Sequence, residues 1–136
     1  MREIKFRGIS DDRDLPYTQW VIGYGVEVIK EANEPDCILL HTENGTFRVY
    51  EGTVGEYTGL KDKNGKEIYE GDLVICYENN GKKNMGHIVF MTEEFKIIWN
   101  DNSYLRLNKI RFWSNLKKIE VIGNIYGDPK IFKEGI

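Results

Sequence analysis

The segment from Thr53 to Val74 constrains the fold more than any other part of the chain, because its turn residues predict a β-hairpin. Within it, Asp62-Lys63-Asn64-Gly65 has an acceptor side chain at the first position of a type I turn and a glycine where the backbone becomes left-handed. The flanking residues are therefore expected to pair as antiparallel strands and to continue into a further strand. The segment holds no recognisable nucleophile, metal cluster or phosphate loop, so it specifies architecture and not chemistry.

The rest of the chain repeats this pattern, which predicts a mainly β protein. Strand-like segments recur roughly every ten residues between Gly, Asn and Asp, and no stretch of about that length keeps a helical apolar period. Asn44-Gly45 stands between two apolar runs and predicts another hairpin. In the second half the pattern predicts a meander and a closing strand, over residues 72–77, 86–91, 95–99, 104–107 and 117–122.

An early strand is predicted around Trp20, Ile22 and Tyr24, which alternate and so share one face. Gly23 and Gly25 fall on the opposite face. That face is therefore expected to be bare of side chains.

The predicted fold is an antiparallel N-terminal β region followed by an SH3-like small barrel. Residues 1–66 form the N-terminal region with its two hairpins, residues 67–127 form the barrel, and residues 128–136 form a C-terminal tail. Closure is favoured because it removes the exposed edges that an open sheet must otherwise protect. Gly71 permits a sharp turn into a strand, and the Asp72 carboxylate is expected to accept backbone N–H groups there.

Composition and charge favour a cytoplasmic protein. The chain has 136 residues, 40% of them apolar, and it contains neither a secretion-signal core nor an apolar run long enough to cross a membrane. Its two cysteines, Cys37 and Cys76, are expected to be reduced and buried. The formal charge is −3, and it is uneven: residues 1–70 hold nine Lys or Arg against fourteen Asp or Glu, whereas residues 71–136 hold ten against eight. Global attraction to DNA is therefore not expected.

No catalytic residue, cofactor site or metal site is predicted. Cys37 and His41 are four residues apart, which on a strand places them ~13 Å apart on one face, too far to share one ion. Only His41 and His87 are available as a catalytic base, and neither is accompanied by a nucleophile elbow or an oxyanion-forming glycine cluster. A packed thiol and an exposed imidazole account for Cys37 and His41 without a metal. Strand alternation and turn capping account for the carboxylates Glu67, Glu70 and Asp72 without a hydrolytic pair.

The strongest candidate binding face lies in residues 102–119, which combine cations with aromatic rings and contain no acidic residue. Single-stranded nucleic acids favour that combination, because bases stack on rings while cations neutralise phosphates. In the alternative interpretation, Tyr104 and Phe112 are core residues and the cations only solvate a loop of the barrel. The candidate residues are Tyr104, Arg106, Lys109, Arg111, Trp113, Lys117 and Lys118.

The chain resembles the YopX-like family of small proteins encoded by phages and prophages of Gram-positive bacteria. The resemblance runs nearly end to end. It implies a mainly β protein with an SH3-type barrel in its C-terminal part and a phage or prophage source, and it carries no assigned activity or catalytic residue. The matching segments are Arg2–Gly8, Trp20–Tyr24, Thr53–Asp72 and Ile119–Tyr126.

Three function classes remain open. The leading hypothesis is a non-catalytic accessory protein that binds a host or phage protein in the host cytoplasm, with homo-oligomer formation as a further possibility. The alternative is a nucleic-acid-binding module that uses residues 102–119. The third and weakest class is an enzyme with a cysteine or carboxylate centre. SH3-like barrels host peptide-binding, nucleic-acid-binding and structural roles, so the fold alone does not separate these classes.

Overall fold

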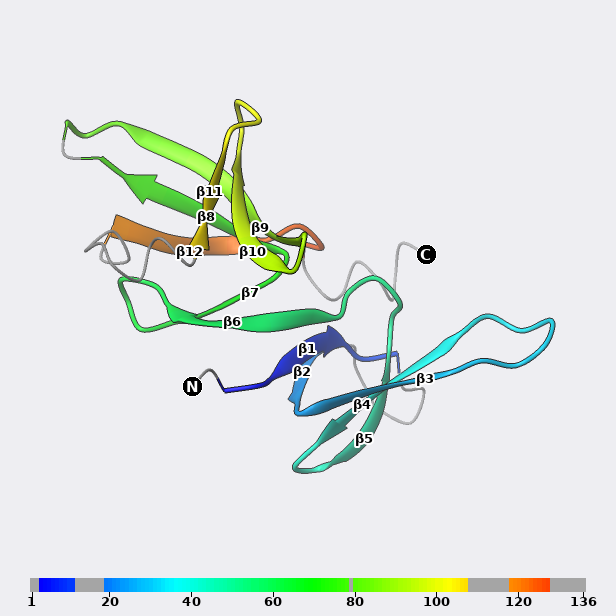
Figure 1. Cartoon of the computed structure of the whole chain (residues 1–136). Coiled ribbons are helices and arrows are strands. Elements are labelled where there is room, and N and C mark those ends of the chain that lie inside the picture. Colours follow the sequence, from blue (N-terminus) through cyan, green and yellow to red (C-terminus); the bar gives the residue numbers. More distant parts are fainter. Residues whose placement is uncertain (1–2, 12–18, 79, 108–117, 128–136) are drawn as a thin grey trace. The chain divides into compact units, whose positions relative to one another are not determined.

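A computed structural model describes residues 3–11, 19–78, 80–107 and 118–127 of the chain. The described residues are mainly β, as the sequence predicts, and the strands pair in antiparallel fashion (Figure 1). The strands are β1 (Phe6–Ile9), β2 (Trp20–Gly23), β3 (Gly25–Ile29), β4 (Cys37–Thr42), β5 (Gly45–Val49), β6 (Gly55–Lys61), β7 (Glu67–Tyr69), β8 (Asp72–Tyr77), β9 (Lys83–Met91), β10 (Glu94–Trp99), β11 (Tyr104–Arg106) and β12 (Ile119–Asn124).

The chain divides into two compact units. Unit 1 contains Glu3–Tyr57 and Tyr126, and unit 2 contains Thr58–Ile125. The boundary falls within β6: Gly55 and Glu56 pair with β1 in unit 1, and the Thr58 hydroxyl donates to the carbonyl oxygen of Ile68 in unit 2 (2.8 Å).

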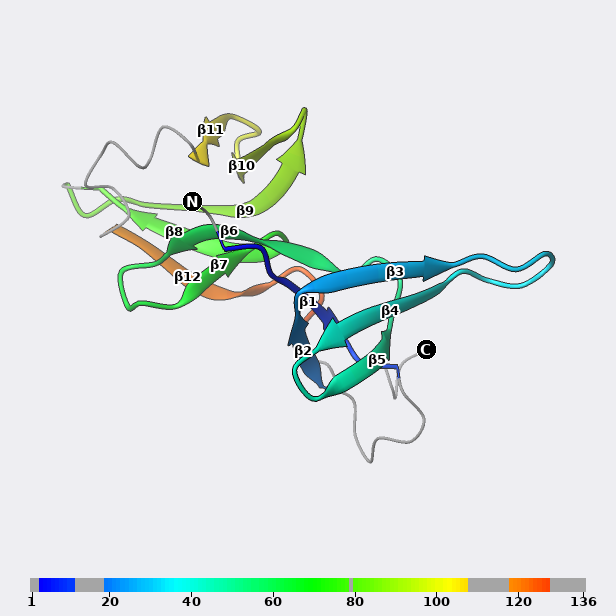
Figure 2. The same ribbon diagram turned by 60° about the horizontal axis from the view of Figure 1, so that its bottom comes forward.

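Unit 1 contains two sets of antiparallel strands and a small hydrophobic core. β1 pairs with β2 and with the start of β6, and β3, β4 and β5 form a sheet in that order. In Figures 1 and 2 the β3–β4 hairpin extends beyond the other strands of the unit. The buried side chains that form the core are Val21, Ile38, Leu40 and Val49.

Gly23 marks the point where the chain leaves β2 for β3, and its open face is closely covered. A Cβ atom at this position would lie 2.2 Å from the backbone oxygen of His41. The amide of Tyr24, the next residue, donates to that same oxygen at 2.9 Å. The face that Gly23 leaves without a side chain is therefore covered, because the β4 backbone occupies the space.

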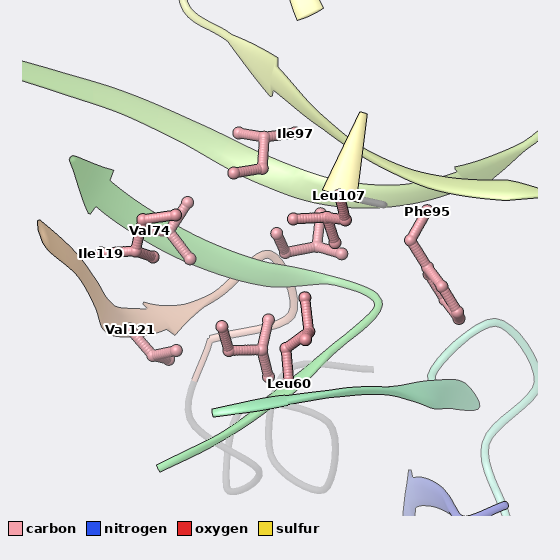
Figure 3. Close-up of a cluster of buried hydrophobic side chains, with 9 residues drawn as sticks. Leu60, Val74, Phe95, Ile97, Leu107, Ile119 and Val121 are labelled. Atoms are coloured by element: carbon pink, nitrogen blue, oxygen red, sulfur yellow. The ribbon is translucent and has the colours of Figure 1, made fainter. Parts of the chain in front are cut away.

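Unit 2 is a five-stranded sheet in the order β11-β10-β9-β8-β12, with the β6–β7 hairpin contributing to its core. Strands β8 to β11 form the predicted meander, and β12 returns to lie beside β8. Figure 3 shows how side chains from these strands converge on one cluster. The buried members of the cluster are Leu60, Ile68, Val74, Ile88, Phe95, Ile97, Leu107, Ile119 and Val121.

The sheet of unit 2 is open in the part of the chain that the structure describes. β11 and β12 are its two edges, and among the described residues they do not pair to close a barrel. Residues 108–117, which connect these two strands in the sequence, lie outside the described residues, as does the predicted C-terminal tail at 128–136.

Two turns confirm the local predictions from sequence. At Asp62–Gly65 the Asp62 carboxylate accepts the amides of Asn64 and Lys66, and Gly65 has a φ of 82°. At Gly71 the φ is 92°, and the buried Asp72 carboxylate accepts the amide of Tyr69 at 2.8 Å.

A further turn, between β9 and β10, stores backbone strain. The pair Met91↔Glu94 closes it around Thr92 and Glu93, whose φ angles are 51° and 64°. This is type I′ geometry, which asparagine and glycine adopt far more readily than a β-branched residue.

We expect the double substitution Thr92→Asn with Glu93→Gly to stabilise unit 2 by about 1 kcal/mol, because it relieves the left-handed strain at both positions. Thermal melts followed by circular dichroism would measure the gain. Glu93→Ala is the matched control and should give no gain, since alanine keeps a Cβ at positive φ. A lower melting temperature for the double variant would contradict the turn assignment.

Candidate functional site

The first candidate surface is the outer edge of β3. This strand pairs with β4 from Gly25↔His41 to Ile29↔Cys37, and it stands at the end of the order β3-β4-β5. No described strand pairs with its other side. Such an edge presents unpaired backbone N–H and C=O groups to any extended chain that approaches it.

The apolar side chains of β3 are exposed to solvent. Val26 is 37% exposed, Val28 48% and Ile29 36%. The register places Val28 opposite the buried Ile38, and places Ile29 opposite Cys37 on the other face. Both faces of the strand therefore offer apolar contacts beside the open backbone edge. Edge strands are usually protected by charges, proline or bulges, and the strand itself contains only one charged residue, Glu27.

The second candidate surface is an aromatic groove in unit 1, with a volume of about 410 Å³. Its large apolar walls are Trp20, Ile22, Tyr24 and Phe47. Ile22 and Tyr24 are each 49% exposed, so the groove is open to solvent. The turn between β4 and β5, residues 42–44, supplies polar groups to the same groove.

One carboxylate dominates the electrostatics of the groove. The Tyr24 hydroxyl donates to Oε1 of Glu43 at 3.2 Å, and the charge of Glu43 raises the pKa of Tyr24 above its usual value. Trp20 is itself in contact with a cation, since the guanidinium carbon of Arg7 lies 4.5 Å from the centroid of its ring. The arrangement is suited to a ligand that carries both apolar surface and positive charge.

The basic and aromatic face predicted from sequence is described only in part. Tyr104 is 61% exposed, and it is therefore not a core residue; the ammonium of Lys96 lies 5.0 Å from its ring centroid. Arg106 donates through Nε and Nη2 to Oε2 of Glu94, both at 2.9 Å. Lys118 is half-buried. The other predicted members, Lys109, Arg111, Trp113 and Lys117, lie outside the described residues.

The His41 side chain lies in a cross-strand network with Glu27 and Thr46. His41 Nε2 lies 2.9 Å from Oε1 of Glu27, and its Nδ1 lies 2.9 Å from Oγ1 of Thr46. The His41 and Glu27 side chains are about half exposed (48% and 53%), and this cluster lines neither the groove nor the cavity of unit 2. An exposed cross-strand network of this kind connects β3, β4 and β5 and is sufficient to orient their side chains.

Cys37 and Cys76 are free, and both are half-buried rather than buried as predicted. Cys37 lies in β4 opposite Ile29 of the edge strand, which leaves it partly open to solvent. Cys76 packs against the core of unit 2, and burial, together with the charge of Glu78, raises the pKa of its thiol. Both cysteines lie near the ends of their strands, where neighbouring residues cover a side chain less completely, and this is why they are not buried.

A second cavity, in unit 2, has a volume of about 560 Å³ and mixed charge. Lys82 and Lys83 line it together with Glu78 and Asp101, beside the ring of Trp99. Opposite charges in similar number give it no clear preference for an anion or a cation. Among the described residues no group of three acidic, histidine or cysteine side chains could hold a metal ion, and no helix there is long and apolar enough to cross a membrane.

Sequence reasoning did not identify the edge strand or the groove. The alternation of Val26 and Val28 around Glu27 was the available signal for β3, and it follows directly on the predicted strand at Trp20–Tyr24. The groove had no such signal, because its walls come from β2 and from the β4–β5 hairpin.

Comparison with known proteins gives one family. The family described as YopX protein matches residues 5–133 of the chain. A comparison with curated proteins finds no match.

Proposed function

The chain belongs to the YopX protein family, and on that premise we propose that it is a non-catalytic protein-binding module, encoded by a phage or prophage and acting in the cytoplasm of the host bacterial cell. The proposed phage or prophage source rests on the family resemblance, and the proposed location rests on the composition of the sequence. The binding role rests on one observation: β3 is an open sheet edge whose side chains are apolar and exposed.

The mode of binding that this edge supports is strand addition. An extended segment of the partner would pair with the outer backbone groups of β3, and its alternate side chains would contact Val26 and Val28 on one face or Ile29 on the other. Main-chain hydrogen bonds would supply the affinity, and the apolar contacts would select the register.

Charge favours a different protein over a second copy of this chain as the partner. Glu3–Tyr57 holds five Lys or Arg residues against eleven Asp or Glu residues, a formal charge of −6. Two copies that met edge to edge would bring two acidic units together, which costs energy and slows the encounter. A partner segment with basic side chains gains from the same field.

We also propose that unit 2 is a small SH3-like barrel. The strand order supports this, because the last strand, β12, lies beside the first, β8, and β9 to β11 follow on the other side. The β6–β7 hairpin adds Leu60 and Ile68 to the core of the same sheet. Barrels of this kind serve peptide binding, nucleic-acid binding and purely structural roles, so this proposal is independent of the partner.

Nucleic-acid binding has less support from the described residues. Of the predicted cations among them, Arg106 is already paired with the Glu94 carboxylate, which cancels its charge where a phosphate would bind. The exposed ring of Tyr104 and the ammonium of Lys96 above it are the features that favour the alternative.

The test of strand addition uses capture from a lysate of a bacterium that carries the gene, followed by measurement on the purified pair. We expect Val28→Lys to lose the partner that the wild type retains, because an edge lysine blocks strand pairing. Ile122→Lys in β12 is the matched control, since Ile122 is 44% exposed and Val28 48%. With the purified partner, amide exchange within β3 should slow.

Three results would count against the proposal. One is an unchanged set of retained proteins for Val28→Lys, and another is a bound partner that leaves exchange in β3 unaltered. The third is tight binding of single-stranded oligonucleotides, for which we expect no measurable affinity at physiological salt. Tight binding that weakens linearly with the logarithm of salt concentration, and that Arg106→Ala reduces, would make the nucleic-acid role the leading one.

A further inference from the structure

We propose that the aromatic groove of unit 1 receives an arginine side chain of the partner protein, with the guanidinium held by Glu43 and the ring of Tyr24. This inference rests on the proposed function, because it assigns a specificity site to the same binding event. The groove lies where β2 leads into β3: Tyr24 is the residue directly before the edge strand.

The size and lining of the groove fit a long side chain with an apolar stem. Its volume of about 410 Å³ is within the range of small ligand sites, and Trp20, Ile22 and Phe47 line it. Long basic side chains cover apolar surface with their methylene groups and keep the charged end at a polar group. Glu43, which is exposed and belongs to the same groove, is the acidic side chain in its lining.

The polar end of the groove is already arranged for a cation. The Tyr24 hydroxyl donates to Oε1 of Glu43 and so orients the carboxylate beside an aromatic ring. A guanidinium that stacks on this ring can donate to the carboxylate at the same time, which combines a cation–π contact with a charge-assisted hydrogen bond. The acidic charge of unit 1 attracts the cation from a distance.

Arginine fits better than lysine for two reasons. The guanidinium is planar, stacks on aromatic faces and donates in a fork that matches a carboxylate, whereas an ammonium is a compact and strongly hydrated point charge. Trp20, which lines the same groove, already contacts a guanidinium within the chain, since the central carbon of the Arg7 guanidinium lies 4.5 Å from its ring centroid.

The experiment uses the full chain and blocked single-residue probes that are too short to add a strand. N-acetyl-arginine methylamide is titrated into the protein while the ring signals of Trp20 and Tyr24 are followed by NMR, with the citrulline and lysine analogues as comparisons. We expect the arginine probe to shift these signals, the lysine probe to bind at least threefold more weakly, and the neutral citrulline probe to bind at least tenfold more weakly. Glu43→Gln should weaken binding of the arginine probe at least fivefold.

Glu51→Gln is the matched control, since Glu51 is an exposed carboxylate of unit 1 outside the groove, and it should bind the arginine probe as the wild type does. Equal binding of the arginine and citrulline probes, equal binding of arginine and lysine, an absence of shifts, or an unchanged affinity in Glu43→Gln would each overturn the assignment. Val28→Lys separates the two proposals: it should lose the protein partner and still bind the arginine probe. If the wild type captures a partner through β3 but ignores the probe, only the groove assignment fails.

Discussion

Gly23→Ala should destabilise unit 1 by about 3 kcal/mol, the largest effect expected of a single methyl group in this chain. The new Cβ would lie 2.2 Å from the carbonyl oxygen of His41 and 2.9 Å from its carbonyl carbon. Both atoms are backbone, so no side-chain rotation relieves the clash, and β2 and β4 must move apart. Chemical denaturation followed by tryptophan fluorescence, with Trp20 in unit 1, measures the loss.

Gly25→Ala is the control for this prediction. It adds the same methyl group two residues later, where the nearest atom is Cδ2 of His41 at 3.9 Å, an ordinary contact. Alanine also costs less conformational entropy than glycine in a strand, so the variant should be neutral or more stable by about 0.5 kcal/mol. Equal stability of the Gly23 and Gly25 variants would contradict the close approach of β2 to β4.

Asp62→Ala should destabilise unit 2 by about 2–4 kcal/mol, because three backbone amides lose a charged acceptor at once. Oδ1 accepts the amides of Asn64 and Lys66 at 2.8 and 2.9 Å, and Oδ2 accepts the buried amide of Val121 at 2.9 Å. Asp62 is 7% exposed, so water cannot replace the carboxylate at all three amides. Thermal or chemical denaturation of the variant provides the measurement.

The same carboxylate makes the stability of unit 2 depend on pH. Burial opposes ionisation of Asp62, but hydrogen bonds from Val121, Lys66 and Asn64 outweigh it and lower its pKa from the ordinary value of 3.8. Since the pKa is lower in the folded state, the stabilisation is complete above the unfolded value and is lost as pH falls through the folded value. Below about pH 4, wild-type stability should therefore fall more steeply than that of Asp62→Asn.

Asp101→Asn tests whether the stabilising effect of Asp62 depends on the burial of its carboxylate. The Asp101 carboxylate also accepts the amide of a following residue, Ser103, and its pKa is also lowered, but it lies at an exposed turn. Asparagine supports the same local turn, so this variant should stay close to the wild type at neutral pH. If it loses as much stability as Asp62→Asn, the turn and not the buried amide of Val121 carries the effect.

Features with local causes could be predicted from sequence. The turns at Asp62–Gly65 and Gly71–Asp72 are encoded by residues within a few positions of each other, and the structure has both. Most predicted strands of the second half also exist, with ends shifted by a few residues, because alternation fixes the strand and tertiary pairing decides where it ends.

Features with distant causes could not be predicted. In β3 the alternation of Val26 and Val28 around Glu27 covers only three residues, and the adjacent apolar Ile29 interrupts it, so it is too short to separate the strand from a loop. The groove joins Trp20 and Tyr24 to Glu43 and Phe47, which are about twenty residues away along the chain. The close contact at Gly23 could not be predicted either, because the carbonyl group that covers it belongs to His41, which is distant in the sequence.

The hydrogen bond between Asp62 and Val121 links the folding of unit 2 to the order in which the chain is synthesised. The turn is local, but its third hydrogen bond joins residues 59 positions apart, and β12 is also the strand that covers one side of β8. During synthesis from the N-terminus, the ribosome must release nearly the whole unit before either contact forms. Until then β8 keeps one open edge, and Oδ2 of Asp62 lacks the amide of Val121. Completion of the sheet of unit 2 therefore depends on a non-local pairing, that of β12 with β8.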